Sequence, residues 1–171
     1  MARSPACIST PRPRRPSQQT FAASYKLQAN GETLALQHFA PAHTDTDIYV
    51  HFQKANVVQM GDTFFNGMYP YIDPGTCGTI TGMIAAADKI LSLADNYTKI
   101  VAGHGPLGNK ADLRKFRDML ITSRDRVQKL KLAGKSAQQA VAEKPFADLD
   151  PVWGKGIINT DQFVQIVYLT L

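Results

Sequence analysis

The stretch that decides the fold runs from Ala42 to Phe65 and reads AHTDTDIYVHFQKANVVQMGDTFF. It contains two short runs, DIYVHF and ANVVQM, which are rich in β-branched and aromatic residues and are typical of two paired strands. A polar residue stands at the outer end of each run, because His43 precedes the first and Asp62 follows the second. The stretch therefore predicts a strand pair that carries polar, functional groups at its ends.

The pattern extends on both sides of this stretch. Upstream, SYKLQANGETLALQHF has two alternating segments around Asn30-Gly31, a pair that fits a tight hairpin turn with positive φ. From Thr79 the apolar residues recur at helical spacing, which predicts an amphipathic helix. A short strand at 100–102 then stops at the Gly and Pro residues of GHGP, so that a loop carries His104.

The last third of the sequence is helical in pattern. Apolar and charged residues alternate at helical spacing between about Asn109 and Leu132, which predicts a long helix, and a shorter helix follows from Ser136. Asn159 and Gln162 have the spacing of a capping box before a final apolar run, so a helix is predicted there too. Strands come first and helices dominate the end.

Length and composition favour one folded domain behind a basic tail. The 171 residues suit a single core. Residues 1–20 are rich in Arg, Pro and Ser without apolar periodicity, so we expect a disordered tail and a folded domain over 21–171. The tail has the character of a GC-rich gene read in the wrong frame or from a displaced start, which sequencing upstream in all frames would test.

The charge and hydropathy of the sequence argue against two classes of partner. Much of the net charge of +5 comes from four arginines of the tail, and the body is nearly neutral, so a solvated surface is favoured over a nucleic-acid site. No apolar run approaches the roughly 20 residues that span a bilayer, so no membrane partner is expected. The sequence has no recognisable signal peptide. Its compartment is left open, with the cytoplasm as the default.

Three polar residues at strand ends form a candidate metal site. His43 precedes one strand, Asp62 follows the next, and His104 follows a third. Loops at one edge of a sheet often carry convergent ligands, and two imidazoles with one carboxylate suit Zn²⁺. Each residue alone is more often structural, and Gly61-Asp62 also fits a simple turn. His38 and His51 lie within strand patterns, which favours structural or exposed histidines there.

The order and spacing of AHTDTD, QMGDTFF and VAGHGPLG resemble the second half of a metallo-β-lactamase-fold hydrolase. The resemblance runs from about Phe21 to the C-terminus and includes the NGMYPYID and WGKG segments. It implies an α/β fold, the second half of an αβ/βα sandwich, with one mostly antiparallel sheet covered by helices. It also implies that His43 binds a first zinc ion, that Asp62 bridges two ions, and that His104 binds the second.

The family signature HxHxDH, which supplies the other ligands in the first half of the fold, does not occur in this sequence. The resemblance therefore implies a zinc-type hydrolase that is truncated and of impaired activity. The alternative is a catalytically silent fragment or interaction module that retains the fold. Without the other half, a sheet face would be exposed, and we expect a homodimer to cover it.

The substrate of an active form would be a small molecule, and a lactam, lactone, thioester or phosphoester all remain open. Aromatic residues after the GD motif either overhang the site, where they would contact an apolar group of the substrate, or belong to the core. This set comprises Phe64, Phe65, Tyr69 and Tyr71. Packing near Gly154 is the favoured role of Trp153.

Overall fold

The computed structural model of the protein describes residues 20–171. The predicted tail, 1–20, lies outside the described residues except for its last member. Five strands, two short 3₁₀ turns and five helices follow in chain order: β1 (Ser24–Ala29), β2 (Glu32–His38), β3 (Ile48–Phe52), β4 (Val57–Gln59), η1 (Gly61–Thr63), η2 (Pro74–Thr76), α1 (Ile80–Leu93), β5 (Lys99–Val101), α2 (Lys110–Leu132), α3 (Ala137–Ala142), α4 (Asp150–Trp153) and α5 (Thr160–Leu169).

The five strands form one sheet in the order β1-β2-β3-β4-β5. The first three pairings are antiparallel, and β5 adds parallel to β4 after the α1 crossover. The hairpin between β1 and β2 turns at Asn30 and Gly31, whose φ angles of 52° and 73° are those of the tight turn that the sequence predicts. The mostly antiparallel α/β architecture expected from the sequence is confirmed.

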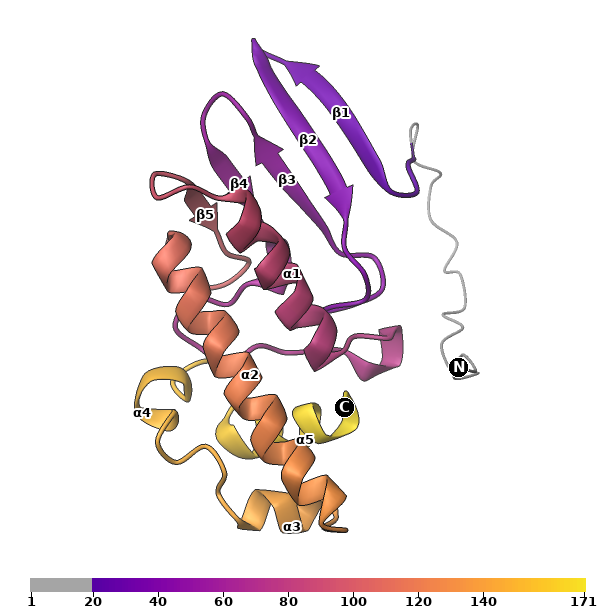
Figure 1. Ribbon diagram of the computed structural model, residues 1–171, viewed down its shortest axis with the longest axis vertical. Coiled ribbons are helices and arrows are strands. Elements are labelled where there is room, and N and C mark those ends of the chain that lie inside the picture. Colours follow the sequence, from indigo (N-terminus) through magenta and orange to yellow (C-terminus); the bar gives the residue numbers. More distant parts are fainter. Residues whose placement is uncertain (1–19) are drawn as a thin grey trace.

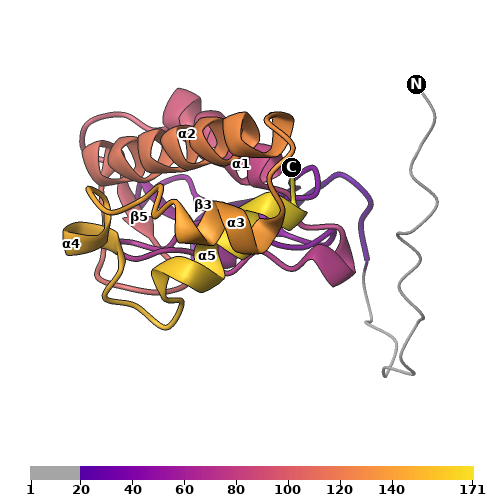
Figure 2. The same ribbon diagram turned by 90° about the horizontal axis from the view of Figure 1, so that it is seen from below.

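Helices α1 and α2 lie side by side over one face of the sheet in both views (Figures 1 and 2). Thr79 caps α1, and Asn109 caps α2 in a capping box, so the predicted helix starts are confirmed. The apolar faces of the two helices share one hydrophobic cluster with the helix-side residues of the sheet. Its fully buried members include Val58, Met83, Ile90, Ile100, Leu113 and Phe116.

The C-terminal helices pack against α2 beyond the end of the sheet, and α3 and α5 lie at the level of the sheet, not in the layer of α1 and α2 (Figure 2). Helices α3 and α5 contact each other and both contact α2, at the end of the molecule that is farthest from β1 and β2 (Figure 1). Asn159 and Gln162 form the predicted capping box of α5. This part of the core is aromatic, with Tyr69 stacked on Phe163 at a centroid distance of 4.5 Å. None of the helices over residues 20–171 is both long and apolar enough to cross a membrane.

The helices cover only one of the two faces of the sheet. The strand register places Tyr49, Val58 and Ile100 on the side of the helices, where all three are buried. Because side chains alternate along a strand, their neighbours point the other way. This second side, named the open face, is mostly apolar and half-buried or exposed. Its apolar members are Tyr25, Leu27, Leu34, Leu36, Ile48, Val50, Phe52, Val57 and Val101, and Glu32, His38, Gln59 and Lys99 are its polar ones.

Candidate metal centre

His43 lies in the loop between β2 and β3, and this loop is fixed on the start of α1. The carbonyl of His43 accepts a hydrogen bond from the Asp73 N–H at 2.9 Å, and that of Ala42 accepts one from the Thr79 N–H at 2.8 Å. The contact is so close that a Cβ on Gly78 would lie 2.3 Å from the His43 carbonyl oxygen. Backbone contacts therefore set the origin of the His43 side chain.

The imidazole of His43 is oriented by the main chain. Its Nδ1 lies 2.8 Å from the carbonyl oxygen of Tyr71. Because a carbonyl oxygen only accepts hydrogen bonds, Nδ1 is the donor, and the neutral imidazole has its lone pair on Nε2. This is the arrangement by which proteins fix the tautomer and ring orientation of a metal-binding histidine.

Asp62 is the middle residue of η1, the turn that follows β4. Gly61 starts the turn with a φ of +55°, a conformation that favours glycine. The hydroxyl of Thr63 donates to the Met60 carbonyl at 2.7 Å and closes the turn. Met60 itself donates its N–H to the carbonyl of Val101 on β5 at 3.0 Å. Asp62 is thereby placed at the end of β4, beside the end of β5.

His104 follows β5, between two glycines that both pack closely on the η1 region. The N–H of Gly103 donates to the Gly61 carbonyl at 2.9 Å, and a Cβ on Gly103 would lie 2.1 Å from Oδ1 of Asp62. Gly105 has a φ of +95°, and a Cβ there would lie 2.2 Å from the carbonyl oxygen of Asn66. The glycines of the GHG motif thus allow His104 to approach Asp62.

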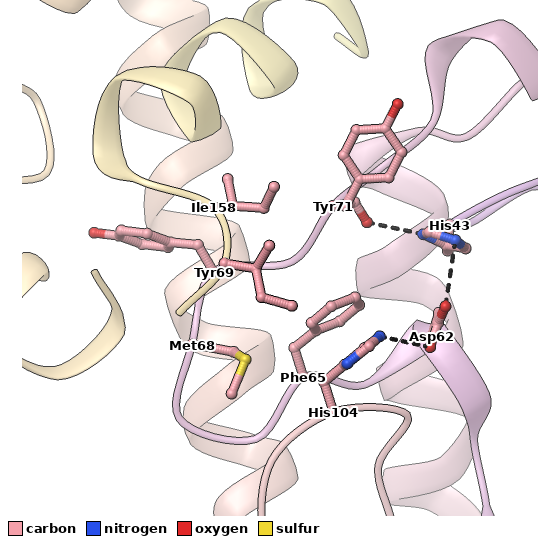
Figure 3. A pocket seen from close by; sticks show the side chains of 9 residues that line it. His43, Asp62, Phe65, Met68, Tyr69, Tyr71, His104 and Ile158 are labelled. Carbon is pink, nitrogen blue, oxygen red and sulfur yellow. Dashed lines mark hydrogen bonds and ion pairs between the residues drawn. The ribbon is translucent and has the colours of Figure 1, made fainter. Parts of the chain in front are cut away.

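The structure brings the three predicted residues together at one edge of the sheet (Figure 3). Nε2 of His43 lies 3.7 Å from Oδ2 of Asp62, and Nε2 of His104 lies 3.4 Å from Oδ1. Two donor atoms that each lie about 2.1 Å from one ion, at the tetrahedral angle, are roughly 3.4 Å apart. Each imidazole therefore faces its own carboxylate oxygen at a separation that suits a shared metal ion. We name these residues the ligand cluster.

The donor set is incomplete for zinc. Over residues 20–171 no group of three or more His, Cys, Asp or Glu side chains is placed to hold one ion. The ligand cluster instead divides into two pairs, His43 with Asp62 and His104 with Asp62. A catalytic zinc ion usually has three protein ligands and a structural one has four. The donor chemistry of each pair suits a divalent ion, but each pair supplies only two donors.

The ligand cluster lines a cavity of about 250 Å³ that is otherwise mostly apolar. The ring of Phe65 stacks on His104 with a centroid distance of 4.7 Å and an interplanar angle of 21°, and Tyr71 meets His43 edge-on at 6.0 Å. The side chain of His43 is 15% exposed, and that of Asp62 is 42% exposed. The apolar lining consists of Phe65, Met68, Tyr69, Tyr71, Ile157 and Ile158.

The wall opposite the ligands belongs to the segment between α4 and α5. A Cβ on Gly156 would lie 2.6 Å from that of Met68, so this segment packs directly on the 66–71 loop. The hydroxyl of Tyr69 donates to Oδ1 of Asp150 at 2.8 Å, and the hydroxyl of Thr160 donates to the same atom at 2.7 Å. Burial, helped by Asp150, raises the pKa of Tyr69 above its ordinary value. This network fixes both ends of the apolar wall.

The aromatic residues that the sequence left open divide between the cavity and the core. Phe64 is fully buried in the core and Tyr69 almost so, whereas Phe65 and Tyr71 flank the ligand cluster (Figure 3). Trp153 is buried and packs near Phe116, which agrees with its predicted structural role. Sequence reasoning did not find Met68, Ile157 or Ile158, because an isolated aliphatic residue in a loop carries no signal of a cavity.

Histidines 38 and 51 lie away from the ligand cluster. His38 is the last residue of β2, and its Nε2 lies 2.8 Å from the carbonyl oxygen of Asp45. His51 lies within β3, opposite Ala35 and Val58. Neither lines the cavity beside Asp62. They agree with the structural or exposed roles that their strand positions predict, and they provide controls for experiments on the other two histidines.

Solved structures with the same arrangement of strands and helices identify the fold. A sec-alkylsulfatase from a Pseudomonas species has a TM-score of 0.68 and is 17% identical over 87% of this chain and 25% of its own. The B3 metallo-β-lactamase BLEG-1 has a TM-score of 0.53 and is 25% identical over 62% of this chain and 50% of its own. The chain has a metallo-β-lactamase-like fold.

A third structure with the metallo-β-lactamase-like fold is a metallo-β-lactamase family protein from Thermus thermophilus. It has a TM-score of 0.61 and is 15% identical over 92% of this chain and 48% of its own. The chain thus spans about a quarter of the alkylsulfatase and about half of the other two proteins. No family model matches the sequence, and the curated proteins include no significant match. The fold is therefore recognised from three-dimensional structure.

Proposed function

We propose that the ligand cluster is one half of a dinuclear, zinc-type metal centre, inherited from a metallo-β-lactamase-fold hydrolase. The observation that carries the proposal is the hydrogen bond from His43 Nδ1 to the Tyr71 carbonyl, which turns the free Nε2 lone pair toward Oδ2 of Asp62. His38 also bonds a carbonyl, that of Asp45, but of the two histidines only His43 faces Asp62 with its other nitrogen. His104 faces the other carboxylate oxygen, so two imidazoles face one carboxylate, which supports a bridging role for Asp62 in the proposal.

In this proposal each side chain has a defined task. His43 and His104 would each offer a nitrogen lone pair to a metal ion, and Asp62, which faces both imidazoles, would offer its carboxylate oxygens. Phe65 and Tyr71 exclude water from one side of the imidazoles. When bound, a divalent ion supplies Lewis acidity and a coordinated water of lowered pKa, which is the chemistry of a metal-dependent hydrolase.

The activity of this chain by itself is proposed to be impaired. The HxHxDH run that completes the site in the family is not in the sequence, and two donors for each ion leave coordination positions that the described residues do not fill. Weak metal binding follows, because zinc sites normally have three or four protein ligands. In this proposal the chain is a truncated family member, and full hydrolytic activity requires further metal ligands from outside this sequence.

The cavity favours a substrate with an apolar group. Opposite the ligand cluster lie Met68, Ile157 and Ile158, and the cavity lining has no Lys or Arg among the described residues that would hold an anionic group. An apolar group of a lactam, lactone, thioester or ester would remove these side chains from water. We therefore propose a small molecule whose hydrolysable bond is flanked by such a group.

The proposal is tested by calorimetric titration of the full chain with Zn²⁺. We expect binding that the double variant His43→Ala/His104→Ala lowers by at least about 100-fold, since even the loss of a partner that only orients a ligand costs about 10-fold or more. The matched control is His38→Ala/His51→Ala, which removes the other two histidines of the sequence and should bind zinc as the natural chain does. Equal loss in both variants, or no binding by the natural chain, would contradict the proposal.

The second candidate is a catalytically silent interaction module that retains the fold. The observation that favours it is that no described group of three donors is placed to hold one ion. Under this alternative the ligand cluster is a hydrogen-bonded remnant, and purified protein should hold no stoichiometric zinc, manganese or iron. Adding metal should then leave the melting temperature unchanged in both the natural chain and His104→Ala.

A further inference from the structure

The β1–β2 hairpin has one polar and one apolar side, although no described helix covers either. In Figure 1 most of both strands lies clear of α1 and α2, and only the end of β2, at Gln37 and His38, borders α1. The helix-side face of the hairpin carries polar residues that suit contact with water, such as Lys26, Gln28 and Thr33, and the hydroxyl of Thr33 donates to Gln28 at 3.0 Å. The other side carries Tyr25, Leu27, Leu34 and Leu36. If both sides of the hairpin faced only water, polar residues would be favoured on both sides.

The apolar side of the hairpin continues across the sheet as the open face. The register aligns Leu36 with Val50 and Leu34 with Phe52, and Val57 lies next to Phe52 on β4. Leu27 is 42% exposed and Ile48 is 36% exposed. Gln59 on β4, between Val50 and Val101, interrupts this surface. A mostly apolar surface that spans five strands is the pattern of a sheet that packs against another layer.

Charge is confined to the margins of the open face. Its charged positions on the strands are Glu32, at the start of β2, and Lys99, on the last strand. The carboxylate of Glu32 is turned to the β3–β4 turn, where it accepts the N–H groups of Lys54 and Ala55 at 2.8 and 2.9 Å. The centre of the surface therefore presents neither a like-charge barrier nor a charge that would select a partner of opposite sign.

We propose that the open face is the interface of a homodimer, in which the sheets of two copies pack face to face about a two-fold axis. A neutral apolar surface is complementary to its own copy, and a two-fold contact uses the same surface twice and closes. Five strands about 4.8 Å apart and roughly 16 Å long cover roughly 400 Å² in projection on each copy. Because protruding side chains make the accessible surface larger than its projection, the two copies together bury on the order of 1,000 Å², as a specific interface requires.

The test uses two matched pairs of substitutions in the same hairpin. Leu27 and Leu34 are register partners on the open face, and Gln28 and Thr33 are the adjacent register partners on the opposite face. The double variants Leu27→Lys/Leu34→Lys and Gln28→Lys/Thr33→Lys introduce the same charges at the same end of the sheet. Only the first pair places them in the proposed interface.

Size-exclusion chromatography with light scattering, at micromolar concentration of the full chain, distinguishes the outcomes. We expect twice the monomer mass of 18.8 kDa for the natural chain and the Gln28→Lys/Thr33→Lys variant, and the monomer mass for Leu27→Lys/Leu34→Lys. Far-ultraviolet circular dichroism checks folding. If the double variant does not fold, the single variant Leu27→Lys, at an already exposed position, replaces it. This variant should raise the dimer dissociation constant at least about 10-fold, because it places a charge in an apolar interface.

A monomeric natural chain overturns the proposal, whether the open face is bare or covered by residues 1–19 of the same chain. Dimers of equal stability from both double variants also overturn it, because the interface would then lie elsewhere.

Discussion

The ligand cluster and the open face are specified in different ways. Each side chain of the ligand cluster is held by main-chain contacts, such as the bond from His43 to the Tyr71 carbonyl and the close approach of Gly103 to Asp62. The open face is specified only by alternation along the strands, and its side chains have no layer above them among the described residues. The first region is preorganised within the chain, and the second depends on what covers it.

This difference separates function from association. Asp62 and His104 are well exposed and take no part in the core, so their loss should alter metal binding and leave the fold intact. Open-face residues contribute buried area only where a partner is present, so their loss should alter association and leave the ligand cluster intact. Four predictions test this separation, beginning with the largest expected effect.

Asp62→Ala should abolish zinc binding at both pairs, because the carboxylate faces both imidazoles. His43→Ala and His104→Ala should each remove one pair, so that zinc stoichiometry falls by half while the other ion is retained. Equilibrium dialysis with metal analysis measures these stoichiometries. The oligomeric state of all three variants should match that of the natural chain. Equal stoichiometry in Asp62→Ala and the single histidine variants would refute the bridging role.

Two adjacent valines of β4 compare the two faces of the sheet directly. Val58 is fully buried on the helix side, and Val57 lies on the open face. Val58→Ala should lower the free energy of unfolding by about 2–3 kcal/mol, from lost burial plus the cavity left behind. Val57→Ala should cost less than about 1 kcal/mol when both are introduced into the Leu27→Lys/Leu34→Lys background, because less burial is lost there. Urea unfolding measures both, and equal costs would show that the open face is covered within one chain.

Gly103→Ala should weaken zinc binding about 10-fold without removing a ligand, as the loss of a supporting contact does. The new Cβ would lie 2.1 Å from Oδ1 of Asp62 and 2.7 Å from the carbonyl of Gly61, so the Asp62 turn must shift. The control is Gly134→Ala after α2, which has a φ of +79° and open space around it. It should cost about 1 kcal/mol of stability through backbone strain and leave the zinc titration unchanged. A zinc affinity that falls equally in both variants would reflect stability alone.

Tyr69→Phe should lower the free energy of unfolding by about 1 kcal/mol near neutral pH, through loss of the hydrogen bond to Asp150. Burial raises the pKa of Tyr69 in the folded chain, whereas an unfolded tyrosine ionises near pH 10. Stability from this group is therefore complete below about pH 10 and is lost as the pH rises further. Denaturant unfolding at about pH 7 and above about pH 10 measures the slope, which Tyr69→Phe should reduce and a control Tyr97→Phe, at an exposed site, should not.

Much of the fold was predictable because its signals are local. The Asn30-Gly31 turn, the apolar spacing of α1 and the capping box at Asn159 each depend on residues within one element. The short helix α4 was not predicted, since four residues give no period to read. The sheet order was also beyond the sequence pattern, because it depends on contacts between distant segments.

The members of the ligand cluster were predictable from the sequence, but its geometry was not. His43, Asp62 and His104 each stand at the end of a strand-like run, which is visible in the sequence. The acceptor for His43 Nδ1 is a main-chain carbonyl 28 residues away. Every residue has such a carbonyl, so the sequence does not show which one accepts. The division of Phe64 to the core and Phe65 to the cavity follows from the extended backbone at Phe64, which turns successive side chains to opposite sides. Which of the two faces the core depends on contacts that the sequence does not show.

Anomalous diffraction at the zinc edge, from crystals of the full chain equilibrated with Zn²⁺, tests the central claim most directly. The account predicts peaks within about 2.0–2.2 Å of Nε2 of His43 and of Nε2 of His104, each shared with a different oxygen of Asp62. Crystals of Asp62→Ala prepared in the same way should show neither peak. Zinc density that lies elsewhere, or that is the same in the natural chain and in Asp62→Ala, would contradict the assignment of these residues as metal ligands.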